Sequence, residues 1–194
     1  MLFVTVSFNN TAGLTDSERK YASGLLQESR ETLLTKVKGL TPAQLAFKAD
    51  SSAWSVAQCV EHITITEDGL FDYAQSALKV PADPSKRNEV KLRDEDVLKM
   101  ITDRSSKFQA QDAVKPTGKF GDFQTTLKEF ISRRDKHINY VTTTTDDLRN
   151  HYNDFPFGKI DAYQTIIFMT GHCNRHTAQI DEIMKNANFP KAGK

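Results

Sequence analysis

Most of the chain repeats apolar residues at the three- and four-residue intervals of an amphipathic helix. The four longest patterns predict helices over residues 15–39, 55–78, 122–143 and 161–188. Three of these begin at a pair typical of a helix N-terminus, namely Thr15 with Glu18, Ser55 with Gln58, and Asp161 with Gln164. Gly39 and Pro190 are typical residues to follow a helix end.

The connections between these helices carry weaker patterns. Thr41 followed by Pro42 predicts a short helix, and residues 94–111 predict a longer, more polar one. Residues 81–85 and 146–159 are rich in turn formers and are expected to be ordered loops. Long helices without alternating strand patterns predict an all-α fold, an antiparallel four-helix bundle with short extra helices in the connections. We expect one domain over residues 1–194, with residues 1–13 as an N-terminal arm.

Composition narrows the class of protein. The 194 residues include 38% hydrophobic and 26% charged residues, as in a globular domain of ordinary size. A net charge of +1 argues against a nucleic-acid surface, and no segment is long and apolar enough to span a membrane. The apolar start of the chain is too short for a signal sequence, so we expect a cytoplasmic protein. Cys59 and Cys173 are the only cysteines, and both are expected to be small buried side chains.

His172 and His176 are four residues apart in the last helix and therefore project from one face. This spacing allows two imidazoles to hold one transition-metal ion. His176 lies on the apolar seam of the helix, where a polar ring needs a partner. The alternative is a histidine that is hydrogen-bonded in the core. The pair is not a metalloprotease signature, because Cys173 stands where that motif has its glutamate.

A third ligand has to come from elsewhere in the chain. His62 is the best placed of the other histidines, since it borders the buried face of the helix over residues 55–78. His137 is expected to face solvent, away from the apolar positions of its helix. His151 falls in a loop and is expected to be exposed.

Two segments resemble the signatures of the DinB-like metalloprotein superfamily. The first is WSVAQCVEHI at 54–63, and the second is FGK at 157–159 followed by GHCNRHTAQI at 171–180. The resemblance covers the order and length of the elements from about residue 15 to 188. It implies a YfiT-like four-helix bundle that binds a divalent metal ion through His62, His172 and His176.

The resemblance also implies a chemistry. Three neutral imidazoles leave a coordination position open, and Zn²⁺ and Ni²⁺ are the metals that suit them best. The family includes S-transferases that use bacillithiol or related low-molecular-weight thiols, and its bundles often form homodimers. We therefore expect metal activation of a thiol for attack on an electrophile, with a small-molecule substrate. The alternative is a non-enzymatic stress-response or binding bundle, with or without metal.

Four other residues have candidate roles near the site or in the core. Gln58 is expected to cap its helix, although it could point toward His62. Arg134 lies on the seam of its helix and is expected to pair with a buried carboxylate, or to extend past the core to solvent, rather than bind an anionic ligand. Gln179 could orient a ligand histidine or pack across the bundle. Trp54 is expected to be a packing anchor.

Overall fold

The computed structural model describes residues 13–106 and 109–191. Its long helices are α1 (Asp16–Val37), α3 (Val56–Ala77), α5 (Phe123–Thr143) and α6 (Ala162–Met184). Shorter helices are α2 (Pro42–Ala46), α4 (Asp94–Thr102) and the 3-10 turns η1 (Pro84–Glu89) and η2 (Asp112–Val114). The strands β1 (Tyr152–Phe155) and β2 (Gly158–Asp161) precede α6. The predicted all-α four-helix bundle is confirmed, and the predicted capping pairs of α1, α3 and α6 are all formed.

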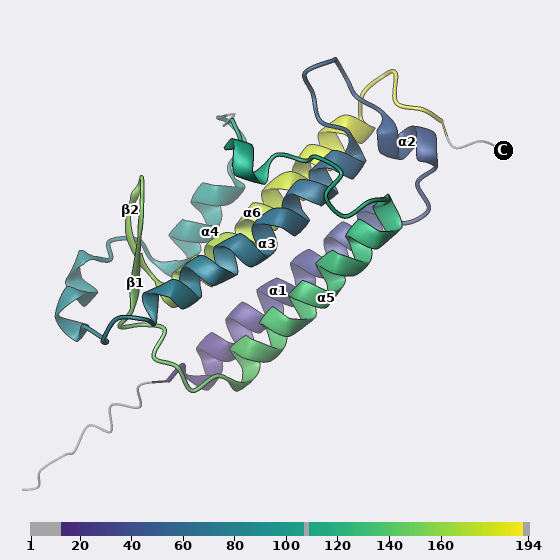
Figure 1. The fold of residues 1–194 in the computed structure, drawn as a ribbon. Coiled ribbons are helices and arrows are strands. Elements are labelled where there is room, and N and C mark those ends of the chain that lie inside the picture. Colours follow the sequence, from purple (N-terminus) through teal and green to yellow (C-terminus); the bar gives the residue numbers. More distant parts are fainter. Residues whose placement is uncertain (1–12, 107–108, 192–194) are drawn as a thin grey trace, which may run out of the picture.

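The four long helices pack as two antiparallel pairs, α1 with α5 and α3 with α6 (Figure 1). Neighbours from different pairs also touch, and α3 runs in the same direction as the adjacent α5. The connection from α3 to α5 must therefore return along the bundle. It carries η1, α4 and η2, and α4 packs on the outer side of α6.

The helix predicted over residues 94–111 is wrong in its length, because α4 ends at Thr102. The Asp103 carboxylate accepts the backbone N–H of Ser105 at 2.8 Å, which forms a local turn in place of another helical turn. The Arg175 guanidinium of α6 donates to the backbone carbonyls of Asp103 and Ser106. The chain after α4 is thus held on α6 in a non-helical path.

A β-hairpin replaces the loop that the sequence predicts over residues 146–159. β1 and β2 pair antiparallel, and Phe155 lies opposite Gly158 across the turn. Gly158 has φ +128°, which a residue with a side chain rarely adopts. The mixed polar and turn-forming composition concealed these two short strands. The final helix also ends earlier than predicted, at Met184 rather than near residue 188.

A fully buried ion pair, Arg134 with Glu67, lies in the core. The Arg134 side chain is 0% exposed and makes two hydrogen bonds to the Glu67 carboxylate, at 2.6 and 2.7 Å. Arg134 also donates to the Leu26 carbonyl oxygen and to the hydroxyl of Ser29. The predicted pairing of Arg134 with a buried carboxylate is confirmed. Removing one partner of such a pair typically costs about 3–5 kcal/mol, because the other charge stays buried.

The expectation that His137 faces solvent is wrong. His137 is 4% exposed, its Nδ1 lies 3.0 Å from the same Glu67 carboxylate, and its ring stacks on Phe71 with centroids 4.0 Å apart. The polar residues around His137 suggested an outward face. The buried carboxylate opposite it is what makes the inward position favourable.

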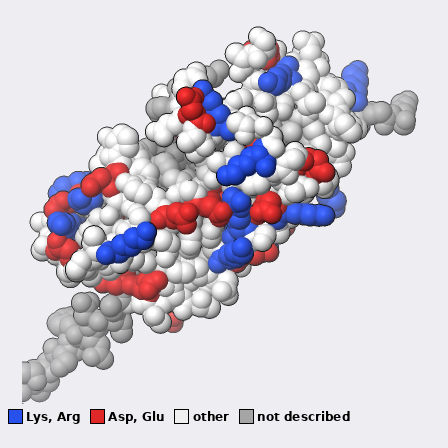
Figure 2. Space-filling model, in the orientation of Figure 1, with Lys and Arg blue, Asp and Glu red and all other residues white. Residues whose placement is uncertain are grey.

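On the face drawn in Figure 2, acidic and basic side chains lie interspersed. Within the described part of the chain, no helix is long and apolar enough to cross a membrane. The expected N-terminal arm lies outside the described residues, apart from its last residue, Gly13.

α4 lies very close to α6 at Gly171, one residue before His172. A Cβ atom added to Gly171 would lie 2.2 Å from Cγ2 of Ile101 and 3.2 Å from Cδ1 of Leu98. Both contacts are shorter than real Cβ atoms ordinarily make, and Ile101 Cγ2 is attached directly to its own Cβ. The absence of a side chain at Gly171 therefore sets the distance between the two helices.

We predict that Gly171→Ala destabilises the fold by about 1–3 kcal/mol, the usual cost of overpacking, despite the better helix propensity of alanine. The measurement is the free energy of unfolding in denaturant. Gly69→Ala is the matched control, since Gly69 lies in α3 and a Cβ atom there would have nothing within 4 Å. That control should gain about 0.5–1 kcal/mol. Equal effects of the two substitutions would contradict the close approach of α4.

Candidate metal centre

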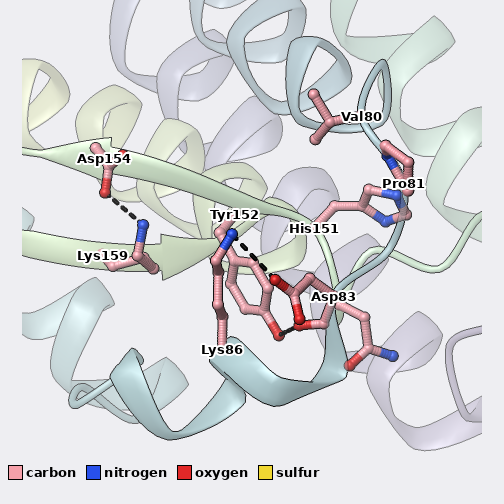
Figure 3. Close-up of a pocket in the computed structure, with 9 residues that line it drawn as sticks. Val80, Pro81, Asp83, Lys86, His151, Tyr152, Asp154 and Lys159 are labelled. Carbon is pink, nitrogen blue, oxygen red and sulfur yellow. Dashed lines mark hydrogen bonds and ion pairs between the residues drawn. The ribbon is translucent and has the colours of Figure 1, made fainter.

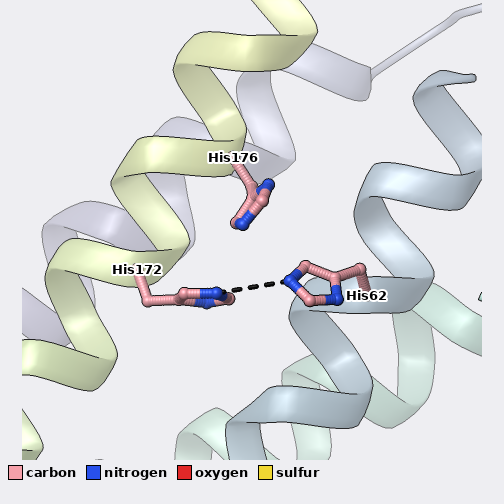
Figure 4. A group of neighbouring side chains, drawn as sticks. All are labelled: His62, His172 and His176. Carbon is pink, nitrogen blue, oxygen red and sulfur yellow. Dashed lines mark hydrogen bonds between the residues drawn. The ribbon is translucent and has the colours of Figure 1, made fainter. Parts of the chain in front are cut away.

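Three histidine rings meet between α3 and α6 (Figure 4). His62 lies in the second turn of α3, and His172 and His176 lie on successive turns of α6. One ring nitrogen from each side chain lies within 4.8 Å of those of the other two. The structure thus brings together the three residues that the sequence and the family resemblance predict as ligands. Their role as ligands remains a prediction.

Nε2 of His62 lies 3.3 Å from Nε2 of His172 (Figure 4). Two nitrogens bound at about 2.0–2.1 Å to one tetrahedral ion are about 3.3–3.4 Å apart. The spacing of this pair therefore fits a shared cation. Without a cation, the lone pair on one of these two nitrogens would face either an N–H proton or the lone pair of the other nitrogen, depending on which nitrogen of each neutral ring is protonated.

Each ring also has a partner at its other nitrogen. Nδ1 of His62 lies 2.7 Å from the Val114 carbonyl oxygen, and Nδ1 of His176 lies 2.9 Å from Oε1 of Gln179. Nδ1 of His172 lies 3.3 Å from the Thr66 hydroxyl. These contacts leave the three Nε2 atoms for a metal ion. The contact of Gln179 with His176 agrees with the orienting role considered for it.

The rings are held in surroundings that disfavour protonation. Burial lowers the pKa of His62, and burial together with the neighbouring histidines lowers the pKa of His172 well below its usual value. Burial, with the adjacent His62, lowers the pKa of His176 to about 3. The Trp54 ring lies against His62 and His176, with centroids 4.7 and 6.0 Å away. Neutral imidazoles are the form that binds metal ions.

The donor set fits a divalent transition metal. It consists of three neutral nitrogen donors, and within the described chain the cluster includes neither a carboxylate nor a thiolate. Three protein ligands leave room for a further ligand, as catalytic sites do. Cys173 is buried beside the Arg134 pair rather than in this cluster, and burial raises the pKa of its thiol. Burial raises the pKa of Cys59 to about 12, so both cysteines have the inert character expected from the sequence.

Other candidates lie outside the cluster. Gln58 caps α3, as predicted, because its backbone N–H donates to the Ser55 hydroxyl and its Oε1 accepts the Ser55 N–H. His151 is partly buried rather than exposed, and its Nδ1 lies 2.6 Å from the Asp147 carbonyl oxygen.

The sequence analysis did not identify Thr66 and Val114 as partners of the histidine rings. Thr66 lies four residues after His62, a spacing that could have identified it.

A depression lies at the hairpin end of the bundle, lined by η1 and β1 (Figure 3). Its volume is about 180 Å³. Its lysines are paired within it, Lys86 with Asp83 at 3.0 Å and Lys159 with Asp154 at 2.8 Å. The Tyr152 hydroxyl donates to the Asp83 carbonyl oxygen. Since these polar groups satisfy one another, the histidine cluster is the stronger candidate site.

Comparisons with known proteins identify a family and a similar fold. The family model of the DinB superfamily matches residues 25–180. Among solved structures, the chain is similar to YfiT from Bacillus subtilis, with a TM-score of 0.58, 16% identity and coverage of 89% of each chain. That protein is described as "a probable metal-dependent hydrolase with an unusual four-helix bundle topology". No curated protein matches the chain.

The lowered pKa values predict how acid affects the metal-free protein. An unfolded histidine protonates near pH 6.5, whereas these rings resist protonation in the fold. Their contribution to stability is therefore complete above about pH 6.5 and is lost as pH falls toward the folded pKa, about 3 for His176. Each such ring contributes a slope of about 1.4 kcal/mol per pH unit in that window.

We predict that His176→Asn reduces this slope between about pH 6.5 and 4.5, because asparagine does not titrate. The measurement is the free energy of unfolding of chelator-treated protein across that range, compared with the wild type. Acid-sensitive groups away from the cluster are common to both proteins and cancel in the difference, and loss of the neighbouring ring also weakens the depression of the His172 pKa, which changes the slope in the same direction. Parallel curves would show that His176 protonates as readily in the fold as in the unfolded chain.

Proposed function

Since the chain belongs to the DinB superfamily, we propose that it binds a divalent metal ion through His62, His172 and His176 and uses it to activate a nucleophile. The observation that supports this proposal is the convergence of three imidazole nitrogens within 4.8 Å. When bound, the ion would lower the pKa of a thiol or a water molecule at its open position. Zn²⁺ and Ni²⁺ are the ions that we favour.

We favour a low-molecular-weight thiol as the nucleophile, and thus an S-transferase. An ordinary thiol has a pKa near about 8.5, so an adjacent cation can convert it to the thiolate without a separate general base. The ligand cluster in the described chain contains no carboxylate to act as that base. Glu61, next to His62 in sequence, instead accepts backbone N–H groups of Thr117 and Lys119.

The chain's own residues would position the reaction. The three imidazoles fix the cation, and Trp54 covers the His62 and His176 side of the cluster with an apolar ring. In a substitution at an electrophilic carbon, a carbon–sulfur bond would form while the leaving group departs with its electron pair. The thiol proton would pass to solvent. A small-molecule electrophile is the substrate class that follows, and we propose a cytoplasmic setting for this reaction.

A hydrolase is the second candidate, favoured by the description of YfiT. In that case, water replaces the thiol at the same position. The two reactions are separated by a screen that pairs the metal-loaded protein with thiols, including bacillithiol, and with ester or amide substrates in the absence of thiol. Turnover that requires a thiol supports the S-transferase. A stable metal complex without turnover in either arm would favour the non-enzymatic binding bundle.

We predict that untagged wild-type protein binds about one equivalent of Zn²⁺ or Ni²⁺, and that His176→Ala loses most of this affinity and all metal-dependent turnover. Elemental analysis and competition with a chromogenic chelator measure the binding. His151→Ala is the matched control, because that ring bonds to the Asp147 carbonyl in a loop outside the cluster. Failure of the wild type to retain either metal after loading would refute the proposed function.

A further inference from the structure

The connection between α4 and α5 reaches the candidate metal centre through residues 112–119, here called the strap. The strap contains η2 and the turn that follows it. It touches α3 at two successive residues, Glu61 and His62, which point about 100° apart around the helix. The contact with Glu61 holds the strap in place, and the contact with His62 involves a predicted metal ligand.

Glu61 holds the strap through a single carboxylate oxygen. Oε1 accepts the backbone N–H of Thr117 at 2.9 Å and that of Lys119 at 2.8 Å. Gly118, between them, has φ +79°, and this left-handed conformation lets both N–H groups face the same acceptor. Glu61 is 7% exposed, so these hydrogen bonds are largely shielded from water.

The strap in turn determines the tautomer of the His62 ring, that is, which ring nitrogen carries the proton. A backbone carbonyl can only accept, so the contact of Nδ1 with the Val114 oxygen requires the proton on Nδ1. Nε2 of His62 then carries the free lone pair, directed at Nε2 of His172. This is the tautomer that a metal ligand bound through Nε2 needs.

The other two rings take their orientation from the helices themselves. Gln179, the partner of His176, lies on the same helix. Thr66, the partner of His172, donates its hydroxyl proton to carbonyl oxygens of α3, at 2.8 and 3.1 Å, and so accepts from the ring. His62 is therefore the predicted ligand whose orientation depends on a connecting segment.

We propose that Glu61 is a positioning residue, which sets His62 as a metal ligand by fixing the strap and, with it, the Val114 carbonyl. The inference rests on the proposed metal site. It assigns Glu61 neither a place in the coordination sphere nor a proton-transfer role. Only an oxygen acceptor is required at this position, and a glutamine side chain supplies one.

The test compares Glu61→Leu with Glu61→Gln, using Glu31→Leu as a control at an exposed acidic position of α1. In metal-free protein, ¹⁵N NMR of the imidazoles reports which ring nitrogen of His62 is protonated. Competition with a chelator reports Zn²⁺ affinity. Glu61→Leu should give a mixture of His62 tautomers and bind Zn²⁺ about 10–100-fold more weakly. Glu61→Gln should resemble the wild type in both measurements.

Two results would overturn the proposal. One is a Glu61→Gln protein that loses Zn²⁺ as completely as Glu61→Leu, since the carboxylate charge itself would then matter. The other is a Glu61→Leu protein with unchanged tautomers and affinity. If Glu61→Leu does not fold, Gly118→Ala supplies the second variant, because it strains the turn while leaving Glu61 in place. A wild type that binds neither Zn²⁺ nor Ni²⁺ refutes the proposed function, whereas the tautomer measurement still tests the strap.

Discussion

Three imidazoles directed at one small volume impose the central electrostatic constraint on this protein. The Nε2 atoms of His62 and His172 are 3.3 Å apart, and burial lowers the pKa of all three rings. Protonation would bring positive charges together in a poorly solvated space, while neutral rings direct lone pairs toward one another. A cation removes both difficulties. The packing of α3 against α6, the Trp54 ring and the outer hydrogen bonds all hold this arrangement.

The sequence predicted the parts of the structure that local rules determine. The capping pairs of α1, α3 and α6 follow from side chain–backbone hydrogen bonds within one turn, and the helical periodicity follows from burial of one face. The three histidines could be selected because two have helical spacing and the third borders an apolar face. The resemblance to two motifs of one family indicated that the segment with His62 and the segment with His172 and His176 form a single site.

The errors occur where distant contacts outweigh local preference. α4 stops at Thr102 because Arg175 of α6 binds the carbonyls beyond it, and His137 turns inward because Glu67 accepts its ring proton from another helix. Neither partner is near its target in sequence. The hairpin was missed because two four-residue strands need each other to form. The contact of the Val114 carbonyl with His62 could not be predicted either, because every residue has a backbone oxygen and the sequence does not distinguish one from another.

The parallel direction of the neighbouring helices α3 and α5 gives the candidate centre its outer contacts. A short turn cannot join such neighbours, so the connection returns along the bundle and brings α4 against α6 and the strap against α3. Gly171 permits the close approach of α4 beside His172, and Glu61 fixes the strap beside His62. One connecting segment thus borders ligand candidates on both helices.

Trp54 is the sole tryptophan of the chain, and its ring lies 4.7 Å from that of His62. Indole fluorescence therefore reports on the immediate surroundings of the histidine cluster, without background from a second such fluorophore. A paramagnetic ion such as Ni²⁺ quenches emission at this range, whereas a closed-shell ion such as Zn²⁺ does not. The protein thus contains its own optical probe for a quenching ion such as Ni²⁺ bound at the proposed site.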